Sequence, residues 1–373
     1  MNGSPLLTDR WARASLASIA PERLLPVFPP DAWHAAIPSL DLWDMWQIAD
    51  AAGRTLLRDG REWWFFLAVP RQDDPEARHD FARIHLVSHG DDGWLHHGPA
   101  FPDGFTPGSR EWSGSARLHK DGTTLLMAFT VAGDRHGGPH FRQRLFESEG
   151  RLVIDGREAR CEGWSAPVET VAADGDWYAR ADQPAPVGGG IKGFRDPGLF
   201  RDPFDGQDYL LFTGSAGPGN EAFDGVIGIA RRDAGGWTLL PPLLTAVGTN
   251  SELERPHIVV RDGRLYLFWS TQGRRFAPGI VAPTGLYGMV ADRLHGPWRP
   301  LNGSGLVAGN PPAAPYQAYC WWVTDEGRML SFVDYAGKDD PQAASVAERR
   351  ARFGGTPAPF FQLTFEGERV TVV

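Results

Sequence analysis

Apolar runs along the chain recur behind a two-residue turn signal, and this pattern predicts β-hairpins throughout. The signal occurs at five places: Asp59-Gly60, Asp121-Gly122, Asp205-Gly206, Asp262-Gly263 and Glu326-Gly327. An Asp-Gly pair between apolar segments is among the strongest hairpin signals that a sequence can give. The runs that follow, such as residues 63–67 (WWFFL), have the length and aromatic content of buried strands. The chain is therefore predicted to be rich in strands.

The spacing of the turns indicates how the strands are grouped. Successive turns lie 62, 84, 57 and 64 residues apart. This loose period fits a four-stranded unit with its loops better than a helical repeat of about 30–45 residues. Five such units fill most of the 373 residues. We therefore predict an all-β fold, a five-bladed β-propeller, in which radial repetition leaves only short strand edges around a central channel.

A short N-terminal helix is the one helical element expected. It runs from about Thr8 to Ala20, where Thr8 is a candidate cap and Leu7, Trp11 and Leu16 share one face. Elsewhere 31 Pro and 45 Gly are scattered and mark turns. The whole chain, 1–373, is expected to form a single domain, with residues 1–35 as a helical strap and residues 36–373 as the propeller.

Composition excludes several classes of partner. An apolar content of 42% allows a sizeable core, while the net charge of −9 and pI near 5.7 argue against binding to nucleic acid or anionic membrane. No stretch approaches the roughly 18 apolar residues that span a bilayer, and no signal peptide is recognisable at the N-terminus. The sequence therefore does not decide the cellular compartment.

Two cysteines, Cys161 and Cys320, are too few for a disulfide framework, although a single bridge between them remains an alternative.

One polar motif precedes each turn at a similar distance. The motifs centre on Asp44, Trp112-Ser113, Arg195-Asp196, Glu254-Arg255 and Tyr319, which lie 15, 8, 9, 8 and 7 residues before their turns. If the strand before each turn is the innermost of its blade, all five motifs face one axial pocket. Carboxylates buried there would be costly unless they were paired or functional. Aromatic rings such as Trp43 and Trp112 offer the stacking faces that sugars favour.

Histidine spacing does not predict a metal site. His85 and His89 lie in a segment that is predicted to be a strand, where four residues separate the two rings by roughly 13 Å along one face. One zinc ion could not bind both. For these residues, and for His96, His97, His136 and His140, we expect surface positions or hydrogen bonds between strands.

Six segments in order along the chain resemble glycoside hydrolase family 68, which contains levansucrases, inulosucrases and bacterial β-fructofuranosidases. They are residues 43–46 (WDMW), 111–116 (EWSGSA), 194–197 (FRDP), 252–255 (ELER), 301–307 (LNGSGLV) and 315–319 (PYQAY). The resemblance implies a five-bladed propeller that cleaves sucrose through a covalent fructosyl-enzyme intermediate and passes the fructosyl unit to water or to a sugar. No cofactor and no obligate protein partner is implied.

The same resemblance implies a role for each site residue. Asp44 is the nucleophile, Glu254 the general acid/base and Asp196 the transition-state stabiliser. These types suit a retaining glycosidase, which needs one ionised carboxyl group to attack the anomeric carbon and one protonated group to release the leaving sugar. The substrate-binding residues implied are Trp43, Trp112, Ser113, Arg195, Glu252, Gln272 and Tyr319.

The chain departs from the family pattern at the rim of the pocket. Levansucrases usually carry an arginine or histidine where Gln272 aligns, and Arg274 or Arg275 is the candidate replacement. Ala318, Cys320 and Trp321 stand where similar enzymes more often have Thr, Ser and His, which leaves polymer synthesis open. Members that bind calcium often have an aspartate at the position of Ser251, so no metal requirement is expected.

Two alternative functions remain from the sequence. A related five-bladed glycosidase would act on fructans or arabinosides and would leave sucrose largely untouched. A carbohydrate-binding propeller without activity would need only the aromatic rings, and it has no use for a nucleophile and an acid such as Asp44 and Glu254.

Overall fold

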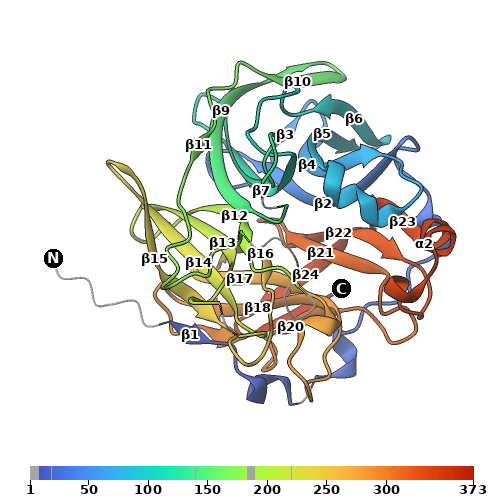
Figure 1. Ribbon diagram of the computed structural model, residues 1–373, viewed down its shortest axis with the longest axis vertical. Coiled ribbons are helices and arrows are strands. Elements are labelled where there is room, and N and C mark those ends of the chain that lie inside the picture. The colour runs from blue at the N-terminus through green and yellow to red at the C-terminus, as the bar shows by residue number, and fades with distance from the viewer. Residues whose placement is uncertain (1–7, 18, 139, 183–189, 220) are drawn as a thin grey trace.

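The computed structural model describes residues 8–17, 19–138, 140–182, 190–219 and 221–373, and within these ranges its regular secondary structure is mostly β-strand (Figure 1). The strands form successive antiparallel groups along the chain, and each group begins with a strand near the middle of the molecule. This arrangement confirms the prediction of a nearly all-β fold.

The first two groups belong to one large sheet. The first contains β2 (Leu40–Ala49), β3 (Leu57–Arg58), β4 (Arg61–Pro70), β5 (Arg83–Gly90) and β6 (Gly93–Pro99). The second contains β7 (Arg110–Leu118), β8 (Thr124–Ala132), β9 (Gln143–Asp155), β10 (Glu158–Glu162) and β11 (Val168–Glu169). A short parallel pairing of β2 with β7 joins them, at Ile48 with Ala116 and Ala49 with Arg117.

The remaining groups form three separate sheets. One contains β12 (Phe194–Arg201), β13 (Asp208–Ser215), β14 (Gly225–Asp233), β15 (Gly236–Thr245) and the N-terminal β1 (Asp9–Arg10). The next contains β16 (Glu254–Arg261), β17 (Arg264–Thr271), β18 (Gly285–Ala291), β19 (Arg299–Pro300) and β20 (Leu306–Gly309). The last contains β21 (Ala318–Val323), β22 (Arg328–Tyr335), β23 (Phe353–Pro357), β24 (Phe361–Glu366) and β25 (Arg369–Val372).

The first strands of the groups pack against one another in sequence order. β2 contacts β7, β7 contacts β12, β12 contacts β16, β16 contacts β21, and β21 returns to contact β2. These strands lie around the middle of the molecule in Figure 1. Residues from segments more than 270 positions apart in sequence are thereby brought to one place.

All five predicted turns lie between paired strands. Asp59-Gly60 joins β3 to β4, and the other four pairs join the first strand of a group to the second. Asp59 and Asp262 adopt the left-handed backbone, with φ of 53° and 49°, and the glycines that follow them do the same. This is the conformation that a two-residue hairpin turn needs, so the turn prediction is confirmed.

The predicted N-terminal α-helix is wrong. Residues 9 and 10 form β1, which pairs in parallel with β15, and the described part of residues 11–20 contains one 3₁₀ turn (Arg13–Leu16), which has no side-chain cap. Leu7 lies outside the described residues. The apolar spacing that suggested a helix instead reflects tertiary burial, because Trp11 is fully buried and Leu16 is buried in the core of the third and fourth groups.

The other helical elements are short and lie in connections. They are the 3₁₀ turns Pro21–Arg23, Pro30–Trp33, Pro75–Ala77, Gly273–Arg275 and Pro341–Ala343, and the α-helices α1 (Arg78–Phe81) and α2 (Val346–Arg352). Ser345 and Glu348 form a capping box at the start of α2, which explains why that segment is helical. None of the described helices has the length and apolar run that a membrane span requires.

Trp11 is expected to be a major stabilising contact of the N-terminal segment. Its ring packs against Trp269, Phe276 and Tyr287 with centroid distances of 5.1, 5.7 and 5.1 Å, and its Nε1 donates to the Ser304 carbonyl at 3.0 Å. Trp11→Ala should lower the free energy of unfolding by about 3–5 kcal/mol, because a large cavity would remain. Chemical denaturation of the variant measures this, and Arg10→Ala, on the exposed side of the same segment, is the control.

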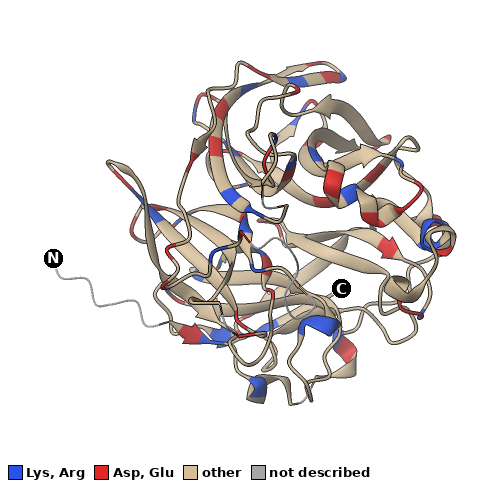
Figure 2. Ribbon diagram, in the orientation of Figure 1, with Lys and Arg blue, Asp and Glu red and all other residues tan. Residues whose placement is uncertain are grey.

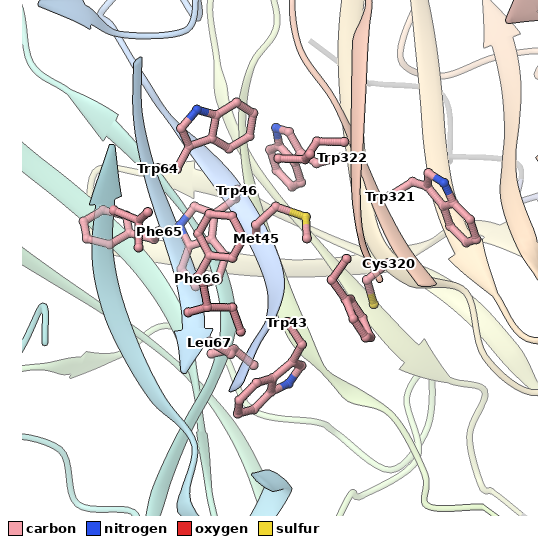
Figure 3. Packing of buried hydrophobic residues seen from close by; sticks show 14 of the residues in the cluster. Trp43, Met45, Trp46, Trp64, Phe65, Phe66, Leu67, Cys320, Trp321 and Trp322 are labelled. Atoms are coloured by element: carbon pink, nitrogen blue, oxygen red, sulfur yellow. The ribbon is translucent and has the colours of Figure 1, made fainter. Parts of the chain in front are cut away.

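The core beneath the middle of the molecule is aromatic. Figure 3 shows Trp43, Met45 and Trp46 from β2 between residues of β4 and β21. Trp64, Phe65 and Phe66 of β4 are fully buried, as is nearly all of Trp321. Charged residues of both signs are interspersed over the strands and loops (Figure 2), in keeping with a chain whose net charge is −9. This packing fixes the inner strands that carry the polar motifs.

Candidate active site

Each inner strand is interrupted by a β-bulge at its polar motif. The pairing register shifts between Trp43 and Met45, Trp112 and Gly114, Arg195 and Gly198, Glu254 and His257, and Tyr319 and Trp322. Asp196, Arg255 and Cys320, which lie within these bulges, have positive φ values of 59°, 57° and 51°. Bulges of this kind occur beside active sites, where they redirect side chains.

The bulges explain how neighbouring residues reach the same cavity. In a regular strand, successive side chains point to opposite faces. Here Trp43 and Asp44 line one cavity together, as do Arg195 and Asp196. The cavity has a volume of about 520 Å³, within the usual range for small-molecule sites. All ten predicted site residues line it: Trp43, Asp44, Trp112, Ser113, Arg195, Asp196, Glu252, Glu254, Gln272 and Tyr319.

Asp44 lines this cavity among hydrogen-bond donors. Ser113 Oγ donates to its Oδ2 at 2.6 Å, and Arg255 Nη1 lies 3.8 Å from the same oxygen. Arg255 also donates to Ser113 Oγ at 3.3 Å and to the Met45 carbonyl at 2.6 Å. The guanidinium group therefore holds both strands that orient Asp44.

Glu254 is held by two side chains from neighbouring strands. Arg195 Nη2 donates to its Oε1 at 2.8 Å, and the Tyr319 hydroxyl donates to its Oε2. Arg195 Nη2 also lies 3.4 Å from Glu252 Oε1, and its Nε lies 3.7 Å from Asp196 Oδ2. Burial lowers the pKa of Arg195, but the three carboxylates outweigh burial and raise it, so the guanidinium stays charged.

Asp196 is the most enclosed of the three carboxylates to which roles were assigned. Its side chain is 7% exposed, compared with 17% for Asp44 and 15% for Glu254. Its Oδ2 accepts from Thr213 Oγ1 at 2.9 Å and from the backbone N–H of Arg255 at 3.4 Å. Burial raises the pKa of Asp196. Asp44 and Glu254 are thus the carboxylates with the greater access to a molecule in the cavity.

Two arginines at the rim of the cavity, Arg274 and Arg275, have different partners. Arg275 Nε lies 2.7 Å from Glu252 Oε2, so its charge is paired with a buried carboxylate. Burial and the charge of Glu254 raise the pKa of Glu252, while Arg275 and Arg195 oppose this. Arg274 is exposed, lines the cavity and donates from Nε to Gln272 Oε1 at 2.6 Å. Of the two candidate replacements for the usual cation, Arg274 is the one beside Gln272.

One wall of the cavity was not predicted from the sequence. It is formed by Glu76, Arg78 and His79 from the connection between β4 and β5, together with Asp334 and Tyr335 at the end of β22. The Tyr335 hydroxyl donates to Glu76 Oε1 at 2.7 Å, and Arg78 Nη1 donates to the same oxygen at 3.0 Å. Burial and Arg78 lower the pKa of His79 to about 4, so its ring is neutral at pH 7. No local motif marks these positions.

The histidines of the first group lie on paired strands. His85 and His89 are both on β5, and His85 Nδ1 lies 2.8 Å from His96 Nε2 on β6. Ser88 Oγ lies 2.7 Å from His97 Nε2. The expected hydrogen bonds between strands are therefore confirmed for His85, His96 and His97. Among the described residues, no cluster of three or more His, Cys, Asp or Glu side chains has the arrangement of a metal site.

The sequence matches the family model described as Levansucrase/Invertase over residues 5–225 and 220–373. A levansucrase of Pseudomonas savastanoi pv. glycinea is 30% identical over 405 residues, which cover 96% of this chain and 92% of that protein. A levansucrase of Zymomonas mobilis subsp. mobilis is 33% identical over 359 residues, 88% of this chain and 81% of that protein.

Solved structures agree with this match. An inulosucrase from Halalkalicoccus jeotgali bound to kestose has a TM-score of 0.88 and 38% identity, covering 98% of this chain and 95% of that one. A β-fructofuranosidase catalytic domain from Microbacterium saccharophilum has a TM-score of 0.84 and 25% identity, and the match covers 100% of this chain and 92% of that one. The nearly all-β architecture is that of this group of β-propeller proteins. The chain therefore belongs to the levansucrase/invertase family, glycoside hydrolase family 68.

Proposed function

We propose that the protein cleaves sucrose and transfers the fructosyl unit to water or to a sugar acceptor. The observation that carries this proposal is the convergence of Asp44, Asp196 and Glu254 on one cavity of about 520 Å³. Family membership adds support, because the relatives are called levansucrases, inulosucrase and β-fructofuranosidase. The inulosucrase structure holds kestose, a saccharide of the kind that such a cavity would accept.

We also propose that the chain is a single five-bladed propeller domain over residues 36–373, with residues 1–35 as a strap. Support comes from the antiparallel groups that begin with β2, β7, β12, β16 and β21 and from the way these strands contact one another in turn. In such a propeller the cavity lies at the axis, where one bulge from each blade supplies its side chains.

In the proposed mechanism Asp44 attacks the anomeric carbon of the fructosyl unit. Ser113 and Arg255 orient its carboxyl group for this attack. Glu254 delivers a proton to the leaving glucose and later accepts one from the incoming water or sugar hydroxyl. Asp196, fixed by Thr213, accepts hydrogen bonds from fructosyl hydroxyls as the ring flattens in the transition state.

The substrate-binding roles follow from position around the cavity. Trp43 and Trp112 offer stacking faces, Arg195 and Glu252 offer polar groups beside Glu254, and Tyr319 holds Glu254 through its hydroxyl. Gln272 and Arg274 stand at the rim, where an acceptor sugar would meet the enzyme. Levansucrases usually carry a positively charged residue where this chain has Gln272. We assign that role to Arg274, because Arg275 is paired with Glu252.

The first experiment is to incubate the protein with concentrated sucrose and to measure released glucose and fructose separately, with products sized by chromatography. We expect glucose release. Equal glucose and fructose would identify a hydrolytic β-fructofuranosidase, and glucose in excess would identify a fructosyltransferase. Sucrose left intact, with release from fructans or arabinosides, would contradict the proposal and favour a related glycosidase.

A further inference from the structure

Asp334 carries an unused hydrogen-bond acceptor at the wall of the cavity. It lies near the end of β22 and lines the cavity. Its Oδ1 is buried and has no hydrogen-bond partner among the described residues. Buried polar atoms in folded proteins are almost always satisfied by protein, water or ligand. Because Asp334 also lines the cavity, a water or a ligand hydroxyl in that cavity is a candidate donor.

The neighbouring carboxylate does not share this property. Glu76 accepts from Tyr335 and Arg78 at 2.7 and 3.0 Å, and Gln342 Nε2 approaches its other oxygen at 3.5 Å. Burial raises the pKa of Glu76, but Arg78 and the Tyr335 hydroxyl outweigh burial and lower it to about 2. Glu76 is thus ionised, and its oxygens accept hydrogen bonds from neighbouring side chains of the same wall. Asp334, the other carboxylate of this wall, has an oxygen without a hydrogen-bond partner among the described residues.

Asp334 lines the same cavity as Asp44 and Arg274. Burial raises the pKa of Asp334 to about 7, with Arg78 and Arg274 opposing the shift and Glu76 and Asp44 adding to it. Asp44 marks the position of the fructosyl unit, and Arg274 marks the rim. Because these residues line one cavity, a second sugar ring bound beside the fructosyl unit would share that cavity with Asp334.

We propose that Asp334 accepts a hydrogen bond from a hydroxyl group of the second sugar, which is the glucosyl unit of sucrose or the acceptor that replaces it. This inference rests on the proposed function and deepens it. A site that accepts a hydrogen bond from a substrate hydroxyl discriminates strongly against a substrate that lacks this group, because its own polar atom is then left unpaired. Asp334 is accordingly a specificity residue for the leaving group and the acceptor.

The test compares two substrates that share the fructosyl unit. Sucrose has a glucosyl leaving group with hydroxyls, whereas a p-nitrophenyl β-fructofuranoside has an aryl leaving group without them. For Asp334→Ala we expect kcat/KM on sucrose to fall roughly 10- to 100-fold, the loss typical when a buried hydrogen-bond partner is removed, and kcat/KM on the aryl substrate to change little. Transfer to added sugar should fall relative to hydrolysis.

Asp41→Asn is the matched control for burial. Asp41 is fully buried, and its Oδ1 also lacks a partner within the part of the chain that the structure describes, but its Oδ2 is paired with Arg350 at 2.7 Å and it does not line the cavity. Asp334→Asn, which nearly preserves shape, guards against a folding defect in the alanine variant. Equal losses on both substrates, or no loss on sucrose, would overturn the role of Asp334. A wild-type protein that cleaves neither substrate would instead overturn the proposed function.

Discussion

Asp44→Asn is expected to abolish glucose release from sucrose while the protein remains folded. The amide cannot form the ester with the fructosyl unit, and removal of the nucleophile from a covalent mechanism costs on the order of 10⁴-fold or more in kcat. The change preserves shape, so the hydrogen bond from Ser113 Oγ, 2.6 Å in the native protein, can persist to the amide oxygen. Glucose release is the measurement, with a thermal melt to establish folding.

Two matched variants separate chemistry from structure. Ser113→Ala removes a donor to Asp44 but leaves the carboxylate, so a loss of roughly 10- to 100-fold is expected, the range for one hydrogen bond to a charged group. Asp50→Asn changes a carboxylate that pairs with Arg54 just beyond β2 and should leave activity unchanged. Substantial glucose release by a folded Asp44→Asn protein would refute the assignment of the nucleophile.

The parts of the fold that could be predicted are those with a local physical cause. The Asp-Gly turns require a backbone conformation that these residues adopt readily, so the hairpins were visible in the sequence. The phase of the motifs relative to the turns then pointed to a common pocket, and the structure brings all ten predicted residues to one cavity. The reason for their convergence was not visible. A bulge is a mismatch between two strands, and neither strand reveals it alone.

The failures have tertiary causes. Trp11 and Leu16 suggested one face of a helix, but Trp11 is buried by Trp269, Phe276 and Tyr287 from distant segments, and these contacts favour an extended chain. The wall residues were missed because each pairs with a remote partner, as Glu76 does with Tyr335. The sequence offers Cys320 only as a disulfide partner or as a departure from the family pattern, whereas the structure places its buried thiol at the cavity, where burial and the charge of Asp44 raise its pKa.

Glu254→Gln is expected to separate the two halves of the proposed reaction. With sucrose, the leaving glucose needs a proton, and loss of the general acid should reduce kcat by about 10²- to 10⁴-fold. With an aryl fructoside that leaves without protonation, the attack by Asp44 should survive, while the second step loses its general base. The result should be a burst of aryl product followed by slow turnover.

The decisive measurement is the intact mass of the protein after this burst. We expect the mass of one fructosyl unit to be added to Glu254→Gln, and Asp44→Asn treated in the same way should gain nothing. Neither Arg195, 2.8 Å from Glu254 Oε1, nor Tyr319 can replace the acid, because the guanidinium stays charged and burial raises the pKa of the Tyr319 hydroxyl well above its usual value. Equal losses on both substrates, with no burst, would mean that Glu254 positions the substrate instead of transferring a proton.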